Sequence, residues 1–150
     1  FFALIGMIYG RTHTRDVTKM GGLLKVIPFI SATYVIAGLA SLGLPGFSGF
    51  VAEMNIFVGA FEHDNMFYRV ATIFSISAIV VTAVYILRVV GMMLMGPVKE
   101  ESYFAFERLT WYEKFGILLM LIPIIAIGVA PLWLSEMIME SLKPFIQGVL

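Results

Sequence analysis

The sequence contains no cysteine and little charge of either sign. Charged residues make up 13% of the chain, and the ten basic and ten acidic side chains give a formal net charge of zero. Without thiols the chain can form no disulfide and can offer no thiolate to an iron–sulfur cluster or a structural zinc ion. Without a net positive charge it has no field that attracts nucleic acid, which we therefore exclude as a partner.

Apolar residues are abundant instead. They make up 60% of the chain, against about 45–50% in ordinary soluble domains. A soluble domain of this length could not bury so much apolar surface, whereas a bilayer solvates it. The composition predicts an all-α, polytopic transmembrane protein. Its opening, apolar from Phe1 to Tyr9, carries no basic leader and no cleavage pattern, so we expect the end of a transmembrane helix there instead of a signal peptide.

Polar stretches divide the apolar sequence into segments. Crossing a bilayer takes about 20 mostly apolar residues in a helix, and an amphipathic surface helix repeats its apolar residues at helical spacing. We expect the end of a transmembrane helix at 1–9, a broken transmembrane helix at 24–62, transmembrane helices at 67–95 and 113–130, and an amphipathic surface segment at 133–148. The apolar face of that last segment comprises Leu134, Met137, Ile138, Leu142 and Phe145. Thr110 and Glu113 have the spacing of a capping box at the start of the last transmembrane helix.

The distribution of charge predicts how the chain crosses the membrane. Lysine and arginine gather in residues 11–25 and 88–114, whereas the loop at 62–65 is acidic. Basic loops stay on the cytoplasmic side. The two basic regions share that side only if residues 26–61 cross once, and this stretch is too long for one straight helix. The sequence therefore predicts a single crossing that is interrupted within residues 43–49.

Four helix-breaking residues mark this interruption. Gly43, Pro45, Gly46 and Gly49 crowd together in the middle of the apolar stretch. Proline lacks an amide donor, and glycine adopts conformations that other residues resist. Irregular backbone at bilayer depth is tolerated where it is buried in protein or lines a wet cavity, and transporters place such half-helix ends at ion sites. We expect a break that lines a proton path, with Ser48 capping its second half; a plain proline kink is the alternative.

Glu53 is the expected proton-transfer residue. It lies about one turn beyond Gly49 and has apolar neighbours on both sides. A charged side chain at the centre of the bilayer costs about 2.5–3.5 kcal/mol on insertion scales, and such residues are usually functional. The apolar setting favours the neutral carboxyl, whereas the helix N-terminus and a lysine from another helix favour the ionised form, so the group can exchange a proton near neutral pH. A structural ion pair with another helix is the alternative.

Other polar residues give no sign of catalysis. His13 lies in a basic loop and is expected to be solvated or to order that loop. His63 stands between Glu62 and Asp64, but a surface triplet with one histidine is a poor metal site. The sequence has no Ser-His-Asp arrangement, no dinucleotide fingerprint and no paired catalytic carboxylates. We therefore expect no catalytic redox residue, cofactor site or metal site in this chain.

Three motifs, in this order, carry a family resemblance. They are Arg-Thr-His-Thr-Arg-Asp at 11–16, Met-Gly-Gly-Leu at 20–23, and Ala-Ser-Leu-Gly-Leu-Pro-Gly-Phe-Ser-Gly-Phe-Val-Ala-Glu at 40–53. Together they resemble the M-type antiporter-like subunit (mitochondrial chain 4 homologue) of respiratory NADH–quinone oxidoreductase, complex I. Beyond Glu62 only the pattern of spans is similar. The resemblance implies that residues 1–150 form the C-terminal part of a proton-translocating membrane domain with one discontinuous helix.

The resemblance also implies a function. In the family, the broken helix of the M-type subunit carries a glutamate where the sister L- and N-type subunits usually carry a lysine, and Glu53 matches that position. Glu53 is then implied to end the half-channel that releases protons outward. The chain would be a subunit of a proton-translocating NADH:quinone oxidoreductase without redox chemistry of its own. NAD, FMN, iron–sulfur clusters and quinone would be bound by partner subunits.

The resemblance also implies partners and a cellular location. The partners would be other membrane subunits of the oxidoreductase, especially the L- and N-type antiporter-like subunits, together with membrane lipid. The expected location is the cell inner (plasma) membrane in preference to the mitochondrial inner membrane. Two alternatives remain open: a subunit of a cation/proton antiporter complex or membrane-bound hydrogenase without NADH–quinone coupling, and a structural membrane module without transport.

Overall fold

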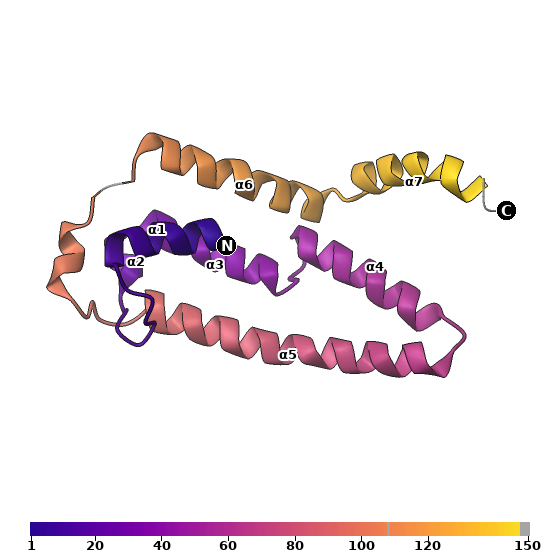
Figure 1. Cartoon of the computed structure of the whole chain (residues 1–150), viewed down its shortest axis with the longest axis horizontal. Coiled ribbons are helices and arrows are strands. Elements are labelled where there is room, and N and C mark those ends of the chain that lie inside the picture. Colours follow the sequence, from indigo (N-terminus) through magenta and orange to yellow (C-terminus); the bar gives the residue numbers. More distant parts are fainter. Residues whose placement is uncertain (108, 148–150) are drawn as a thin grey trace.

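The fold is an elongated arrangement of helices (Figure 1). The computed structural model describes residues 1–107 and 109–147, and within these ranges every regular element is helical, as the composition predicts. The elements are α1 (Phe2–Thr12), α2 (Leu23–Val26), α3 (Pro28–Ser41), α4 (Ser48–Glu62), α5 (Met66–Leu94), the 3-10 helix η1 (Glu101–Ala105), α6 (Trp111–Val129) and α7 (Leu132–Gln147).

The stretch predicted as one broken helix is interrupted twice. The main break separates α3, which ends at Ser41, from α4, which begins at Ser48. A second, shorter break separates α2 from α3 at Ile27, whose φ of −127° and ψ of 66° are not helical. This second break was not predicted from the sequence. Its cause is Pro28, because a proline disfavours helical backbone in the residue before it.

The α2–α3–α4 segment runs antiparallel to α5. All three of its helices contact α5, and Figure 1 shows α5 extending beneath both sides of the main break. The 29 residues of α5 span about 43 Å at 1.5 Å per residue, more than the roughly 30 Å of a hydrocarbon core. With 14 and 15 residues, α3 and α4 reach only about 21–22 Å each, so a crossing on this side needs both.

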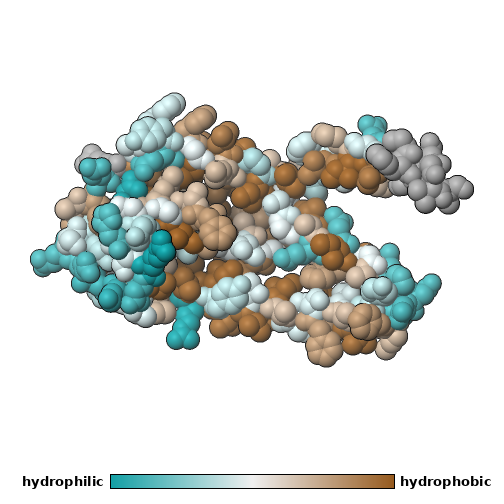
Figure 2. Space-filling model, in the orientation of Figure 1, coloured by the Kyte–Doolittle hydropathy of each residue, from teal (hydrophilic) through white to brown (hydrophobic). Residues whose placement is uncertain are grey.

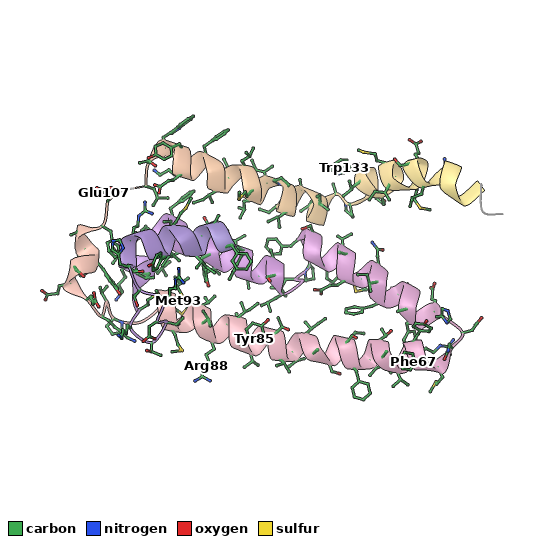
Figure 3. All side chains as sticks on the ribbon, in the orientation of Figure 1. Phe67, Tyr85, Arg88, Met93, Glu107 and Trp133 are labelled. Atoms are coloured by element: carbon green, nitrogen blue, oxygen red, sulfur yellow. The ribbon has the colours of Figure 1, made fainter. Side chains whose placement is uncertain are left out.

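The surface has the polarity of a membrane protein. Two helices, α5 and α6, are long and apolar enough to cross a bilayer, and their apolar side chains are largely exposed. In Figure 2 hydrophobic residues occupy the middle of the molecule, while hydrophilic ones gather at its two ends. Arg88 is exposed towards one of these ends and projects from α5 away from the other helices (Figure 3). Lipid contact accounts for apolar exposure of this extent.

The two basic regions meet at one end of the molecule, as predicted. The amide of Gly22 donates to the carbonyl of Met95 over 3.1 Å, and Lys99 donates to the carbonyl of Thr18. Gly22 has a φ of +68°, and a Cβ atom at this position would lie 2.7 Å from the amide nitrogen of Val98. Only glycine satisfies both constraints. The loop after α1 is therefore fixed to the loop after α5.

Hydrogen bonds also order the loop after α1. The hydroxyl and the amide of Thr18 donate to the Asp16 carboxylate over 2.6 and 3.0 Å. The Thr18 side-chain and backbone hydrogen bonds lower the pKa of Asp16, and the charges of Lys19 and Lys99 act in the same direction. The loop thus holds its acidic residue ionised among its basic ones.

The start of α6 is tied to the end of α1. The predicted capping box is confirmed: the Glu113 carboxylate accepts from the amide of Thr110 over 2.9 Å. The same carboxylate accepts from the Arg11 guanidinium over 3.0 Å, and the two side chains are only 13% and 21% exposed. This shielded ion pair joins the last turn of α1 to the first turn of α6.

Buried apolar side chains form one cluster near the basic end. They come from α1, α2, α3, α5, η1 and α6 and from the segments that flank α2 and α3, whereas α4 contributes none. The cluster comprises Leu4, Ile8, Met20, Leu23, Ile27, Ile30, Tyr34, Leu42, Ile86, Val90, Met93, Leu94, Tyr103 and Ile117.

The last helix, α7, lies apart from this cluster. It continues beyond the end of α6 in Figure 1. Of its expected apolar face, Met137, Ile138 and Leu142 are exposed and Leu134 is half-buried. Trp133 is visible at its start in Figure 3. The side chain of Phe145 and residue 148, both included in the predicted segment, lie outside what the structure describes.

Candidate functional site

The main break is a short loop closed by its own backbone hydrogen bonds. After α3, the amide of Gly43 donates to the carbonyl of Ala40 over 3.2 Å, and the amide of Phe47 donates to the carbonyl of Leu44 over 3.2 Å. Gly43 and Gly46 have φ values of +63° and +98°. This left-handed region is open to glycine and strained for other residues. The two glycines therefore give the loop its shape.

Ser48 does not cap the second half-helix, contrary to the sequence prediction. The N-cap position belongs to Phe47, whose φ of −119° and ψ of 154° are extended, and no side-chain cap hydrogen bond forms there. Ser48 is already the first helical residue. Its hydroxyl is therefore one position too late to accept from the orphan amides of the first turn.

Gly49 brings the two half-helices together. A Cβ atom at Gly49 would lie 2.7 Å from the carbonyl oxygen of Ala40, which is closer than real Cβ contacts. The first turn of α4 thus packs directly on the last turn of α3. The two half-helix ends are in contact through backbone atoms, and a side chain at position 49 would force them apart.

Glu53 faces the break from the second turn of α4. Its side chain is half-buried, and its carboxylate lies against the Cα atom of Gly43. A Cβ atom built on Gly43 would be 2.7 Å from Cδ and 3.0 Å from Oε1 of Glu53, and would overlap the other carboxylate oxygen. Within the described residues no basic side chain lies at ion-pair distance from Glu53. The carboxyl group therefore occupies the break without a partner charge from this part of the chain.

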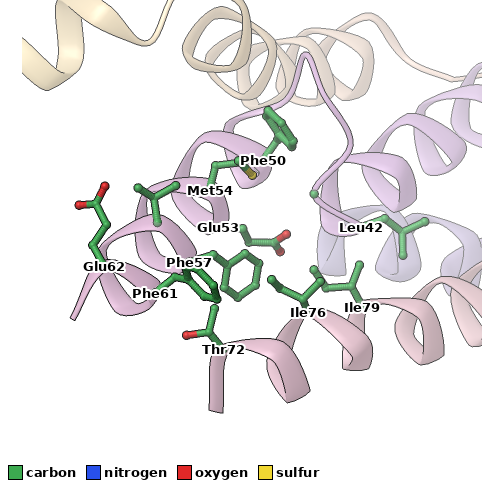
Figure 4. Close-up of a pocket in the computed structure, with 12 residues that line it drawn as sticks. Leu42, Phe50, Glu53, Met54, Phe57, Phe61, Glu62, Thr72, Ile76 and Ile79 are labelled. Carbon is green, nitrogen blue, oxygen red and sulfur yellow. The ribbon is translucent and has the colours of Figure 1, made fainter. Parts of the chain in front are cut away.

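A cavity of about 420 Å³ extends from this carboxyl group. In Figure 4 the Glu53 side chain points into it between α4 and α5. The cavity follows α4 to Glu62, at the acidic end, about 13 Å away at 1.5 Å per residue. The lining residues are Leu42, Gly43, Phe50, Glu53, Met54, Phe57, Val58, Phe61, Glu62, Thr72, Ile76 and Ile79.

Few polar groups face this cavity. The hydroxyl of Thr72 donates to the carbonyl of Tyr68 over 2.7 Å, so it is already engaged. The two carboxylates, Glu53 at the break and Glu62 at the acidic end of α4, are the charged members of the lining. The arrangement therefore holds one carboxyl group at each end of an otherwise apolar groove.

The other residues singled out from the sequence lie in loops or at helix ends. Pro45 is exposed in the loop, and Gly46 contacts α6. His13 ends α1 with a left-handed φ of 50°, and the Nδ1 atom of His63 accepts from the amide of Asn65 over 3.1 Å. The two histidines thus end a helix and order a loop. In the part of the chain that the structure describes, no group of three or more residues could hold a metal ion.

Comparison with known proteins places the chain among membrane subunits. The family described as NADH:quinone oxidoreductase/Mrp antiporter, TM, matches residues 1–82, which include both half-helices and the break. The NAD(P)H-quinone oxidoreductase chain 4 1 of Trichormus variabilis is 37% identical over 141 residues, which cover 91% of this chain and 27% of the relative. The chain 4 2 of Picosynechococcus sp. is 39% identical over 136 residues, which cover 87% and 26%. The chain thus spans about a quarter of the length of these relatives.

Proposed function

The chain belongs to the NADH:quinone oxidoreductase/Mrp antiporter membrane family, and from this premise we propose that it is part of a proton-translocating, M-type antiporter-like subunit of an NAD(P)H–quinone oxidoreductase. The relatives at 37–39% identity are named as chain 4 of that enzyme. Electron transfer takes place in other subunits, and this chain moves protons. It is a subunit of a translocase and not a redox catalyst itself.

The observation that carries this proposal is the position of Glu53. The carboxyl group of Glu53 is half-buried in the second turn of α4 and has no partner charge among the described residues, so it can bind and release a proton without breaking an ion pair there. When water enters the cavity, the ionised form is solvated and the proton leaves. The cavity beside Glu53, of about 420 Å³, supplies the room for that water.

The orientation gives the transfer a direction. The regions 11–25 and 88–114, which hold most of the lysine and arginine residues, are joined by hydrogen bonds at one end of the molecule, and the positive-inside rule assigns that end to the cytoplasm. The lining of the cavity extends from Glu53 to Glu62, at the opposite, acidic end. Glu53 thus receives protons from the inner side and releases them outward, along the groove that leads to Glu62.

The setting of the subunit follows from the same proposal. The chain crosses the cell inner (plasma) membrane several times and is surrounded by lipid and by other membrane subunits, among them the L- and N-type antiporter-like subunits. NAD, FMN, iron–sulfur clusters and quinone are bound by partner subunits, and this chain binds none of them. Coupling between the subunits then acts on the protonation of Glu53.

The test is Glu53→Gln in the full subunit, assembled in the complex and reconstituted in vesicles. Glutamine keeps the shape of the side chain but cannot release a proton. We expect NADH oxidation by quinone to persist and the number of protons moved per NADH to fall. Glu101→Gln, at an exposed position in η1, is the matched control and should leave the ratio unchanged. An unchanged ratio in Glu53→Gln contradicts the proposal.

Two other functions make different predictions. In a cation/proton antiporter complex or a membrane-bound hydrogenase, transport would require sodium or would run without NADH and quinone. In a structural module, Glu53 would form a permanent ion pair with another helix, and Glu53→Gln would assemble poorly. A complex that assembles normally, pumps with NADH and needs no sodium excludes both alternatives.

A further inference from the structure

The C-terminal end of α6 lies directly on the main break. A Cβ atom at Gly128 would overlap the carbonyl oxygen of Gly46 and both the Cα and amide nitrogen of Phe47. These are backbone atoms, which cannot move aside as the end of a flexible side chain can. Elsewhere on α6, a Cβ atom at Gly116 would meet nothing within 4 Å. The contact is therefore specific to position 128 and does not follow from glycine in an apolar helix.

The contacted loop determines where Glu53 lies. Phe47 is the N-cap of α4, so a displacement of its backbone carries the first turns of the helix with it. Glu53 stands in the second of these turns. On the other side of the break, Gly49 already touches the carbonyl of Ala40, and the Glu53 carboxylate already touches Gly43. The loop has α6 on one side and α3 on the other, and backbone contacts on both sides leave little free space.

The far end of α6 is also fixed. Glu113 in its first turn binds Arg11 of α1 over 3.0 Å, so α6 is held at the basic end and presses on the break with its last turn.

We propose that Gly128 is a positioning residue for proton transfer: by its lack of a side chain it lets α6 hold the Gly46–Phe47 backbone where Glu53 meets Gly43. This inference rests on the proposed function of Glu53. It differs from a simple packing role, because a side chain at 128 should change the chemistry of one distant carboxyl group and not merely weaken the fold. No polar atom of residue 128 itself takes part.

The experiment measures Glu53 directly. A hydrophobic carbodiimide adds the O–H of a neutral carboxyl group across one C=N bond to give an O-acylisourea. The acyl group then migrates from oxygen to nitrogen and leaves a stable N-acylurea, which mass spectrometry locates. We would compare the full complex carrying wild-type subunit, Gly128→Val and Gly116→Val, and measure the labelling rate of Glu53 and the protons moved per NADH, each as a function of pH. Glu62 serves as an internal reference in the same preparation.

For Gly128→Val we expect the labelling rate of Glu53 to change about tenfold and the pH profile of pumping to shift, since misplacing a reacting group by about 1 Å can cost up to about 10²-fold. Gly116→Val should match wild type in both. If valine prevents assembly, Gly128→Ala adds one methyl group and gives the same comparison. Labelling and pumping profiles that are identical in the 128 and 116 variants overturn the inference. Altered labelling with unaltered pumping supports Gly128 as a positioning residue and overturns the proposed role of Glu53.

Discussion

The carboxylate of Glu53 rests on the Cα atom of Gly43, across the break from the helix that carries it. The contact joins a carboxyl group in an apolar groove to a glycine with a φ of +63°. The position of the carboxylate and the conformation of the glycine depend on each other. The left-handed glycine leaves open the space that the carboxylate fills, and the carboxylate has no room beside any larger residue.

Gly43→Ala tests this contact. Alanine should cost about 1–2 kcal/mol for its left-handed backbone, and its methyl group should also displace the carboxylate. In the double variant with Glu53→Ala the displaced group is absent, so the two effects should not add. We expect a coupling of about 0.5–3 kcal/mol, measured from thermal unfolding midpoints of the four assembled complexes. Strict additivity would show that the two residues do not touch.

Gly49→Ala tests the approach of the two half-helices. The new methyl group would lie 2.7 Å from the Ala40 carbonyl oxygen, so we expect destabilisation by about 1–3 kcal/mol together with reduced pumping. Gly59→Ala, on the same helix with nothing within 4 Å, is the control. It should be neutral or stabilising by up to about 1 kcal/mol, the helix propensity gain. Equal thermal midpoints for the two variants would contradict the packing described.

Arg11→Gln tests the tie between α1 and α6. Because Arg11 and Glu113 are only 13% and 21% exposed, we expect the loss of this charged hydrogen bond to cost about 1.5–3 kcal/mol. The nearby Glu107, exposed beside the same ion pair, provides the control variant Glu107→Gln. Thermal unfolding of the complex measures both. A charge-reversed pair, Arg11→Glu with Glu113→Arg, should recover part of the loss.

The amphipathic character of α7 predicts contact with lipid on one face. A photoreactive amino acid placed at Ile138 should form adducts with lipid, whereas one at Glu140, on the polar face, should form several-fold fewer. Both positions are exposed in the structure, so exposure alone predicts equal labelling. Mass spectrometry of the adducts distinguishes the two. Equal lipid labelling at both positions would show that α7 does not lie at a membrane surface.

Features that depend on local composition were predictable from the sequence. A long run of apolar residues between Arg69 and Arg88 leads to α5 because length and hydropathy suffice to define such a helix. The capping box of Thr110 and Glu113 is recognisable because its two hydrogen bonds join residues three apart. The main break follows from Gly43, Pro45 and their neighbours for the same reason: the conformational limits belong to the residues themselves.

Features that depend on packing were not predictable. Gly116 and Gly128 look alike in the sequence, yet one faces open space and the other the backbone of the break. The ion pair of Arg11 with Glu113 joins residues far apart in the chain, and charge alone does not select one carboxylate from ten acidic residues. Ser48 failed as a cap because the helix starts one residue earlier than a serine cap requires, a shift within the ordinary uncertainty of helix boundaries.

The uneven burial along the broken helix gives its two halves different mechanical characters. The half before the break packs Ile30, Tyr34 and its neighbours into the core, whereas α4 places no residue there. Opening of backbone hydrogen bonds costs least where few side chains must be unpacked with them. In this chain, deuterium exchange should therefore be fastest in α4, the half that carries Glu53. Thermal motion that widens the groove would not displace the helices at the basic end.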